Sequence, residues 1–121
     1  MSKIEGIDDL LNQFHKMGNM DAALEKSVRK WTEYVRGEAA DLCPVRTGEL
    51  RRSIHTDVQH NGDSIDGIIY TNKEYAPHVE LGTSKQKAQP YLFPALNNNK
   101  DKVTKGIQDD MAKAIKGAVR S

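Results

Sequence analysis

The sequence has little of what marks secreted, membrane or metal-binding proteins. It contains one cysteine, Cys43, in 121 residues, which excludes an intrachain disulfide and a cysteine metal cluster. We expect Cys43 to be a buried, inert thiol. No apolar run approaches the roughly 20 residues that span a bilayer, and the amino terminus has no signal-peptide pattern. We therefore expect a soluble, unexported protein that contacts no membrane.

The chain also lacks an excess of charge of either sign. Its 18 basic and 17 acidic residues give a formal net charge of +1, whereas nucleic-acid binders usually carry a dense basic surface. Only 37% of the residues are hydrophobic, which indicates one thin-cored domain over residues 1–121. Such a subunit gains stability from packing against its neighbours.

Catalytic and metal-binding patterns are missing as well. The histidines, which are His15, His55, His60 and His78, have no metal-ligand spacing with one another or with Cys43. Ser53, Thr83 and Cys43 lack a recognisable base. A hydrolase that used Ser53, His55 or His78 is the weaker alternative. We predict no catalytic residue, no cofactor, no metal and no enzymatic activity, and interpret carboxylates such as Glu80 as solvated or locally paired.

Three apolar patterns predict helices. Residues from Ile4 to Met17 repeat at helical spacing, and a longer stripe runs from Asp21 to Leu42, where Pro44 ends it. Trp31 lies on that stripe and is expected in the core. A closing helix begins near Pro94, because proline suits a first helical turn.

The middle of the chain predicts a hairpin. Residues 54–60 and 65–71 alternate like strands around Asn61-Gly62-Asp63. Short helical turns are expected within 47–53 and 74–81, an exposed loop over 82–89, and a short strand or extended segment over 91–93. The predicted fold is α+β, with long helices packed on one face of a small antiparallel sheet. Its parts are the helices of 1–43, the hairpin and loop region of 44–93, and the helix of 94–121.

Basic and polar residues mark two candidate contact surfaces. The predicted partner-contact set is Arg46, Arg51, Arg52, Thr83, Lys85, Gln86, Lys87 and Gln89. Sparse basic residues of this kind can touch DNA phosphates without sequence preference. The near-neutral total charge favours contacts with partner proteins over contacts with DNA.

Three ordered segments resemble a known family. They are residues 43–54 (CPVRTGELRRSI), 75–83 (YAPHVELGT) and 88–96 (AQPYLFPAL). Together they are similar to the small head–tail joining and tail-completion proteins of long-tailed bacteriophages, related to the lambda-type minor tail protein Z. His78 stands where an aromatic residue is commoner in that family, and Tyr91 replaces a common phenylalanine.

The motif residues have structural roles that follow from their chemistry. Pro44 stops the long helix, Thr47 can cap the next turn, and Leu50 returns an apolar side chain to the core. Gly82 permits a tight exit from residues 75–81, and Pro90 fixes an extended approach to the last helix. The full set of structural motif residues is Pro44, Thr47, Gly48, Leu50, Tyr75, Val79, Glu80, Gly82, Pro90 and Pro94.

The resemblance implies a ring-forming virion protein that is assembled in the host cytoplasm and completes the tail or neck around the DNA passage. A hexamer is favoured, and a dodecamer is the alternative. Implied partners are the connector or stopper, the tail terminator and the tail tube, with non-specific contact to passing DNA. The competing hypotheses are another neck connector, either an adaptor or a stopper, and a small nucleic-acid-binding protein.

Overall fold

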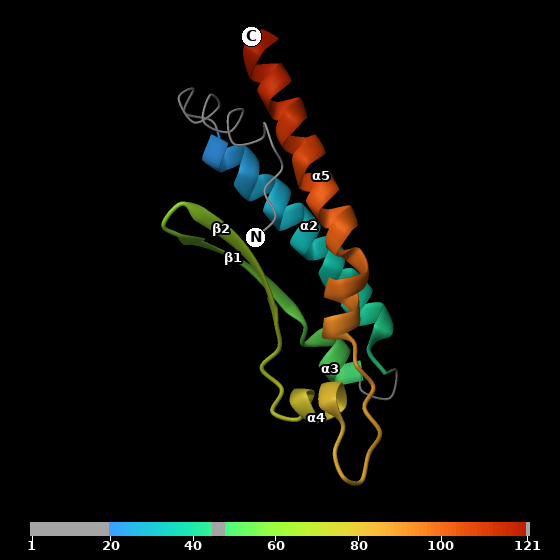
Figure 1. Ribbon diagram of the computed structural model, residues 1–121. Helices are drawn as coiled ribbons and strands as arrows, with labels where there is room; N and C mark the ends of the chain where they lie inside the picture. The colour runs from blue at the N-terminus through green and yellow to red at the C-terminus, as the bar shows by residue number, and fades with distance from the viewer. Residues whose placement is uncertain (1–19, 45–47, 121) are drawn as a thin grey trace.

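The computed structural model describes residues 20–44 and 48–120. The elements are α2 (Met20–Leu42), α3 (Gly48–Arg52), β1 (His55–Asn61), β2 (Ser64–Tyr70), α4 (Ala76–Leu81) and α5 (Leu92–Arg120). The helix predicted over Ile4 to Met17 lies outside the described residues, as do Arg46 and Thr47. The observed arrangement confirms the predicted α+β fold, in which long helices pack against a small antiparallel sheet (Figure 1).

Helix α2 is the centre of the molecule. It packs against α5 on one side and against both strands on another, and Figure 1 shows it between the hairpin and α5. The amino-terminal end of α2 and the carboxy-terminal end of α5 diverge in the same view. The long apolar stripe predicted for α2 is thus divided between two neighbours.

The two strands form a regular antiparallel hairpin. Thr56 pairs with Ile69 and His60 with Ile65, and the turn between the strands contains Gly62 at a φ of 60°, as the Asn-Gly pair predicted. Both strands lie within one residue of their predicted limits.

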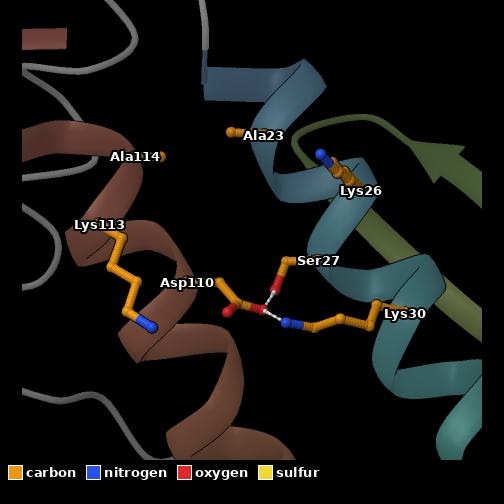
Figure 2. A pocket seen from close by; sticks show the side chains of 7 residues that line it. All are labelled: Ala23, Lys26, Ser27, Lys30, Asp110, Lys113 and Ala114. Atoms are coloured by element: carbon orange, nitrogen blue, oxygen red, sulfur yellow. Dashed lines mark hydrogen bonds and ion pairs between the residues drawn. The ribbon is translucent and has the colours of Figure 1, made fainter. Parts of the chain in front are cut away.

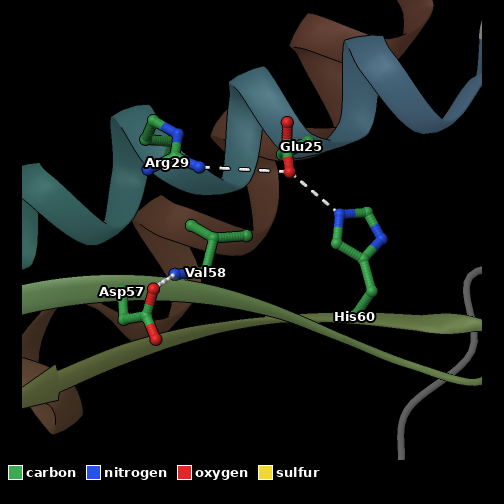
Figure 3. A network of polar contacts seen from close by, with 5 residues as sticks. All are labelled: Glu25, Arg29, Asp57, Val58 and His60. Carbon is green, nitrogen blue, oxygen red and sulfur yellow. Dashed lines mark hydrogen bonds and ion pairs between the residues drawn. The ribbon is translucent and has the colours of Figure 1, made fainter.

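His55 and His60 differ in parity along β1, which places them on opposite faces of the hairpin. His60 Nε2 lies 2.9 Å from Glu25 Oε1 of α2 (Figure 3), whereas the His55 ring packs against Tyr70 with 5.7 Å between ring centroids. The hydrogen bond with His60 lowers the pKa of the Glu25 carboxyl. His60 therefore helps to join the hairpin to α2.

The main core lies where α2, α3, α4 and the start of α5 meet. Its buried residues are Val35, Ala39, Cys43, Leu50, Ile54, Ala76, Tyr91 and Ala95. The Cys43 thiol is buried, as predicted. Trp31 is only partly buried and lies outside this main cluster; its indole packs edge-on against Tyr34 instead. The prediction of Trp31 as a core residue therefore needs correction.

The start of α5 differs from its predicted form. The strand or extended structure expected over residues 91–93 is wrong for Leu92 and Phe93, because α5 begins at Leu92. Pro94 lies in the first turn, as predicted. The physical reason is a cap supplied by Glu80, eleven residues or more away along the chain, which local sequence patterns do not reveal.

Candidate interaction surface

One end of the molecule gathers the segments that carry the sequence motifs. We call this region the loop end, and define it as α3, α4, the loop over residues 82–90 and the first turn of α5. Figure 1 shows α3 and α4 close together there, with the loop extending beyond them before the chain enters α5. All the predicted contact residues that the structure describes belong to the loop end.

Glu80 fixes the entry into α5. Its Oε1 accepts backbone N–H bonds from Tyr91 at 3.2 Å and from Leu92 at 2.9 Å, and its Oε2 accepts one from Phe93 at 3.2 Å. The first N–H groups of a helix have no partner within the helix, and a carboxylate there also suits the helix dipole. Glu80 is therefore a long-range helix cap, and its interpretation as a solvated or locally paired charge is wrong.

The loop itself is built by backbone and hydroxyl hydrogen bonds. Thr83 N donates to Gln86 O at 2.9 Å, and Thr83 Oγ1 accepts from the N–H groups of Lys85 and Gln86 at 3.2 and 3.0 Å. Gln89 N donates to Val79 O at 2.8 Å, and this bond holds the second half of the loop against α4. The loop thus has a defined shape, in which Thr83 serves as a structural residue as well as a candidate contact.

Gly82 is required by this geometry. Its φ is 77°, in the left-handed region that side-chain-bearing residues avoid. A Cβ at this position would also lie 2.7 Å from the backbone nitrogen of Ala88. The tight exit predicted for Gly82 is therefore confirmed, and both reasons favour glycine.

The predicted contact residues that the structure describes lie on the loop and on α3. Lys85, Gln86, Lys87 and Gln89 are all exposed on the loop. Arg52 is exposed on α3, while Arg51 Nη2 lies 3.3 Å from Asp41 Oδ1 of α2. A hollow beside α4 is lined by Tyr75, His78, Val79, Thr83, Gln86, Lys87 and Gln89. The structure thus joins the second motif segment to the candidate loop on one surface.

Exposed apolar side chains are the part of this surface that the sequence did not identify. Leu81 is 77% exposed and Phe93 is 68% exposed. They lie at the end of α4 and at the start of α5, on either side of the loop. Leu81 belongs to the apolar residues of the predicted turn over 74–81, and Phe93 to the apolar run over 91–93. No local signal separates either residue from its buried neighbours.

Ser53 and His55, which the hydrolase alternative would use, lie in different surroundings. The Ser53 hydroxyl donates to Leu50 O at 2.7 Å and lies 2.6 Å from Thr71 Oγ1, whereas His55 packs on Tyr70. Over residues 20–44 and 48–120, no cluster of three or more His, Cys, Asp or Glu side chains could hold a metal ion. The helices in the same ranges are too short or too polar to cross a membrane.

Tyr91 brings a hydroxyl into the core without a partner. Its side chain is fully buried, and its Oη has no hydrogen-bond partner among the described residues. Burial raises the pKa of the Tyr91 phenol to about 12, with smaller effects of Cys43, Glu80 and Tyr75 in the same direction. A buried hydroxyl group without a hydrogen bond lowers the stability of the folded protein.

Replacement of Tyr91 by phenylalanine is therefore expected to raise the free energy of unfolding by about 1 kcal/mol near neutral pH. The pKa of Tyr91 is higher in the folded than in the unfolded chain, so the wild type should lose further stability as pH rises from about 10 to about 12. Denaturant titrations across this range should show the stability gap between Y91F and wild type widening with pH. A constant or shrinking gap would contradict the prediction.

A cluster of polar side chains joins α2 to α5, away from the loop end. Asp110 Oδ2 of α5 accepts hydrogen bonds from Ser27 Oγ at 2.8 Å and Trp31 Nε1 at 2.9 Å, and lies 2.7 Å from Lys30 Nζ. Figure 2 shows Asp110 pointing from α5 toward Ser27 and Lys30 on α2. Burial acts to raise the pKa of Asp110, but the hydrogen bonds from Lys30, Ser27 and Trp31 outweigh it, so that pKa is lowered.

Replacement of Asp110 by alanine should lower the free energy of unfolding by about 1.5 kcal/mol. The loss is moderate because the site adjoins an open pocket, where water can reach the freed donors. Since folding lowers the pKa of Asp110, its contribution is fully present above the unfolded pKa and is lost as pH falls through the lower pKa of the folded state. Urea titrations should therefore show the wild type and D110A converging in strongly acidic solution; parallel curves would refute this role.

Comparison with known proteins gives one family match. Residues 8–82 match the family model described as "Bacteriophage HK97-gp10, putative tail-component". This range is more than half of the chain and includes α2, the hairpin and α4, but not the third motif segment over residues 88–96. No curated protein and no solved structure matches the chain. The protein belongs to the HK97-gp10-like family of bacteriophage tail components.

Proposed function

We propose that the protein is a ring-forming tail-completion component that joins tail to head around the DNA passage. The observation that carries this proposal is the pair of exposed apolar residues, Leu81 and Phe93, beside a loop of defined shape. We take these two exposed apolar side chains, one at each end of the loop, as the anchors of a contact surface. In a ring, such a surface meets a different surface of the next copy, and closure buries it in every subunit.

Partner proteins suit the loop end better than DNA does. Leu81 and Phe93 contribute apolar area that a phosphate backbone would not cover, and the loop adds only two lysines, Lys85 and Lys87. Arg51 already pairs with Asp41. Contacts with passing DNA are therefore proposed as local and secondary, through the exposed lysines of the loop.

The finer assignments belong to the same proposal. The ring is a hexamer, with a dodecamer as the alternative, and its neighbours are the connector or stopper, the tail terminator and the tail tube. The role is structural and non-enzymatic, and the relation to the lambda-type minor tail protein Z is part of the proposal. An adaptor or stopper position elsewhere in the neck is the second candidate, which subunit counting in assembled particles would distinguish.

The test replaces the exposed apolar pair in the phage. Leu81→Asp with Phe93→Asp should leave the thermal unfolding of the isolated protein nearly unchanged, because both side chains are exposed. Infectious particles should fall at least tenfold, with filled heads and separate tails accumulating in electron micrographs. The matched control, Leu81→Met with Phe93→Leu, keeps the surface apolar and should assemble normally. Wild-type assembly by the aspartate variant would reject this surface.

A second experiment distinguishes the nucleic-acid hypothesis. A dedicated DNA binder should bind duplex DNA tightly, with an affinity that falls steeply as salt increases. The proposed tail component should bind duplex DNA weakly at physiological salt, and Lys85→Ala with Lys87→Ala should have little effect on particle assembly. Tight binding that those two substitutions abolish would favour the nucleic-acid binder instead.

A further inference from the structure

An apolar groove runs along α2 between β2 and α5. Its floor contains Val28, Trp31 and Val35, and its walls come from both neighbouring elements. The complete lining is Val28, Trp31, Thr32, Val35, Ile65, Gly67, Ile68, Ile69, Leu96, Val103 and Ile107. The polar side-chain atoms of this lining are the Thr32 hydroxyl and Trp31 Nε1, and Trp31 Nε1 already donates to Asp110. The groove continues into a hollow lined in part by Phe93 and Lys100.

The groove leaves apolar area without a covering element among the described residues. Leu96 is 52% exposed, and Trp31, Ile65, Val103 and Ile107 are each only partly buried. Among the described elements, the groove is lined by α2, β2 and α5 alone. At roughly 25 cal/mol per Å² of apolar surface, a segment that covered this groove would contribute substantially to stability.

We propose that residues 4–17 of the same chain occupy this groove as an amphipathic helix. Their apolar residues are Ile4, Ile7, Leu10, Leu11, Phe14 and Met17, which repeat at helical spacing. The opposite face of such a helix would carry Glu5, Asp9, Asn12 and Lys16. An apolar stripe with one polar face matches an apolar groove that is open to solvent on one side. This inference does not depend on the proposed ring.

The lengths of the segment and the groove agree. Gly18-Asn19 separates Met17 from the start of α2 at Met20 and can reverse the chain. Val28 and Val35 lie about 12 and 22 Å along α2 from Met20, and a helix over residues 4–17 is about 20 Å long. Folding back antiparallel to α2, it would reach from the turn to the far part of the groove.

The second groove along α2 has the wrong chemistry for this stripe. It lies on the side of α2 shown in Figure 2, and three of its seven lining residues are lysines, Lys26, Lys30 and Lys113. Asp110 and Ser27 add further polar atoms. Burying the apolar stripe there would desolvate charges without pairing them. The apolar groove is therefore the site for residues 4–17.

Trp31, the only tryptophan of the chain, reports occupancy of the groove directly. Leu11→Asp with Phe14→Asp should displace the segment, shift the fluorescence emission of Trp31 to longer wavelength and increase acrylamide quenching at least twofold. The matched control, Asn12→Asp with Gln13→Asp, adds the same charge on the polar side and should behave as wild type. Equal quenching in all three proteins would overturn the proposal.

Crosslinking identifies which chain supplies the segment. In a Cys43→Ala background, Leu11→Cys and Ile65→Cys should be joined by a short bismaleimide within one chain, giving a faster-migrating monomer band. Asn12→Cys with Ile65→Cys is the control and should crosslink poorly. A crosslinked dimer would show that the segment of a second copy fills the groove. A failure to crosslink would show that residues 4–17 do not lie in the groove. Either result rejects the proposal. The measurements use purified protein, so they stand apart from the tests of tail assembly.

Discussion

Replacement of Glu80 by alanine is expected to lower the free energy of unfolding by about 3 kcal/mol, the largest effect we predict for a single side chain. The carboxylate accepts three backbone N–H bonds at the start of α5, and Tyr91 beside it is fully buried. Loss of an ordinary helix cap costs about 1 kcal/mol. Here the same group also holds α4 to α5, and bonds to a charged acceptor are stronger than neutral ones.

The matched control is Glu80→Gln, which keeps the length of the side chain and one oxygen acceptor but removes the charge. We expect it to lose about half as much stability as E80A. Urea denaturation measures both losses, and hydrogen exchange should show faster exchange at the amides of residues 91–93 in E80A. An alanine variant as stable as the wild type would show that the cap does not hold α5 in solution.

Gly106→Ala should destabilise the protein by about 2 kcal/mol, although alanine normally favours a helix over glycine. A Cβ on residue 106 of α5 would lie 2.1 Å from Cζ2 and 2.3 Å from Cε2 of the Trp31 ring. Trp31 cannot move freely, since its Nε1 donates to Asp110 and its ring packs against Tyr34. The added methyl group would therefore push α5 away from α2.

Gly37→Ala is the matched control for that substitution. Gly37 also lies inside a long helix, but a Cβ there would meet nothing within 4 Å. It should therefore raise stability by up to about 1 kcal/mol through helix propensity alone. Opposite signs for the two substitutions in thermal and denaturant unfolding would establish the contact between Gly106 and Trp31. Stabilisation by both would refute it.

Much of the fold followed from local patterns. The apolar period of α2, the stop before Pro44 and the Asn-Gly turn each depend on a few neighbouring residues, and each was predicted correctly. The position of Gly82 was likewise predictable, because a tight exit from α4 needs a backbone that tolerates positive φ. Local rules suffice for these features since the energies that decide them act within a few residues.

Burial on long helices was less predictable. Trp31 and Phe93 have the same hydrophobic character as Val35 and Ala95, yet only the latter two are buried in the main core. Which apolar residue faces the core depends on the crossing of α2 and α5 and on the placement of α4. Neither of these is encoded in the spacing of apolar residues on one helix.

The sequence by itself determined the α+β class, the long helix α2, the hairpin and the motif order that leads to the phage family. Only the tertiary structure decided the role of Glu80, the junction at Asp110 and the close approach of Gly106 to Trp31. The physical reason is that each of these contacts joins residues distant in the chain. Hydrogen-bond satisfaction and steric fit between them exist only after the helices have packed.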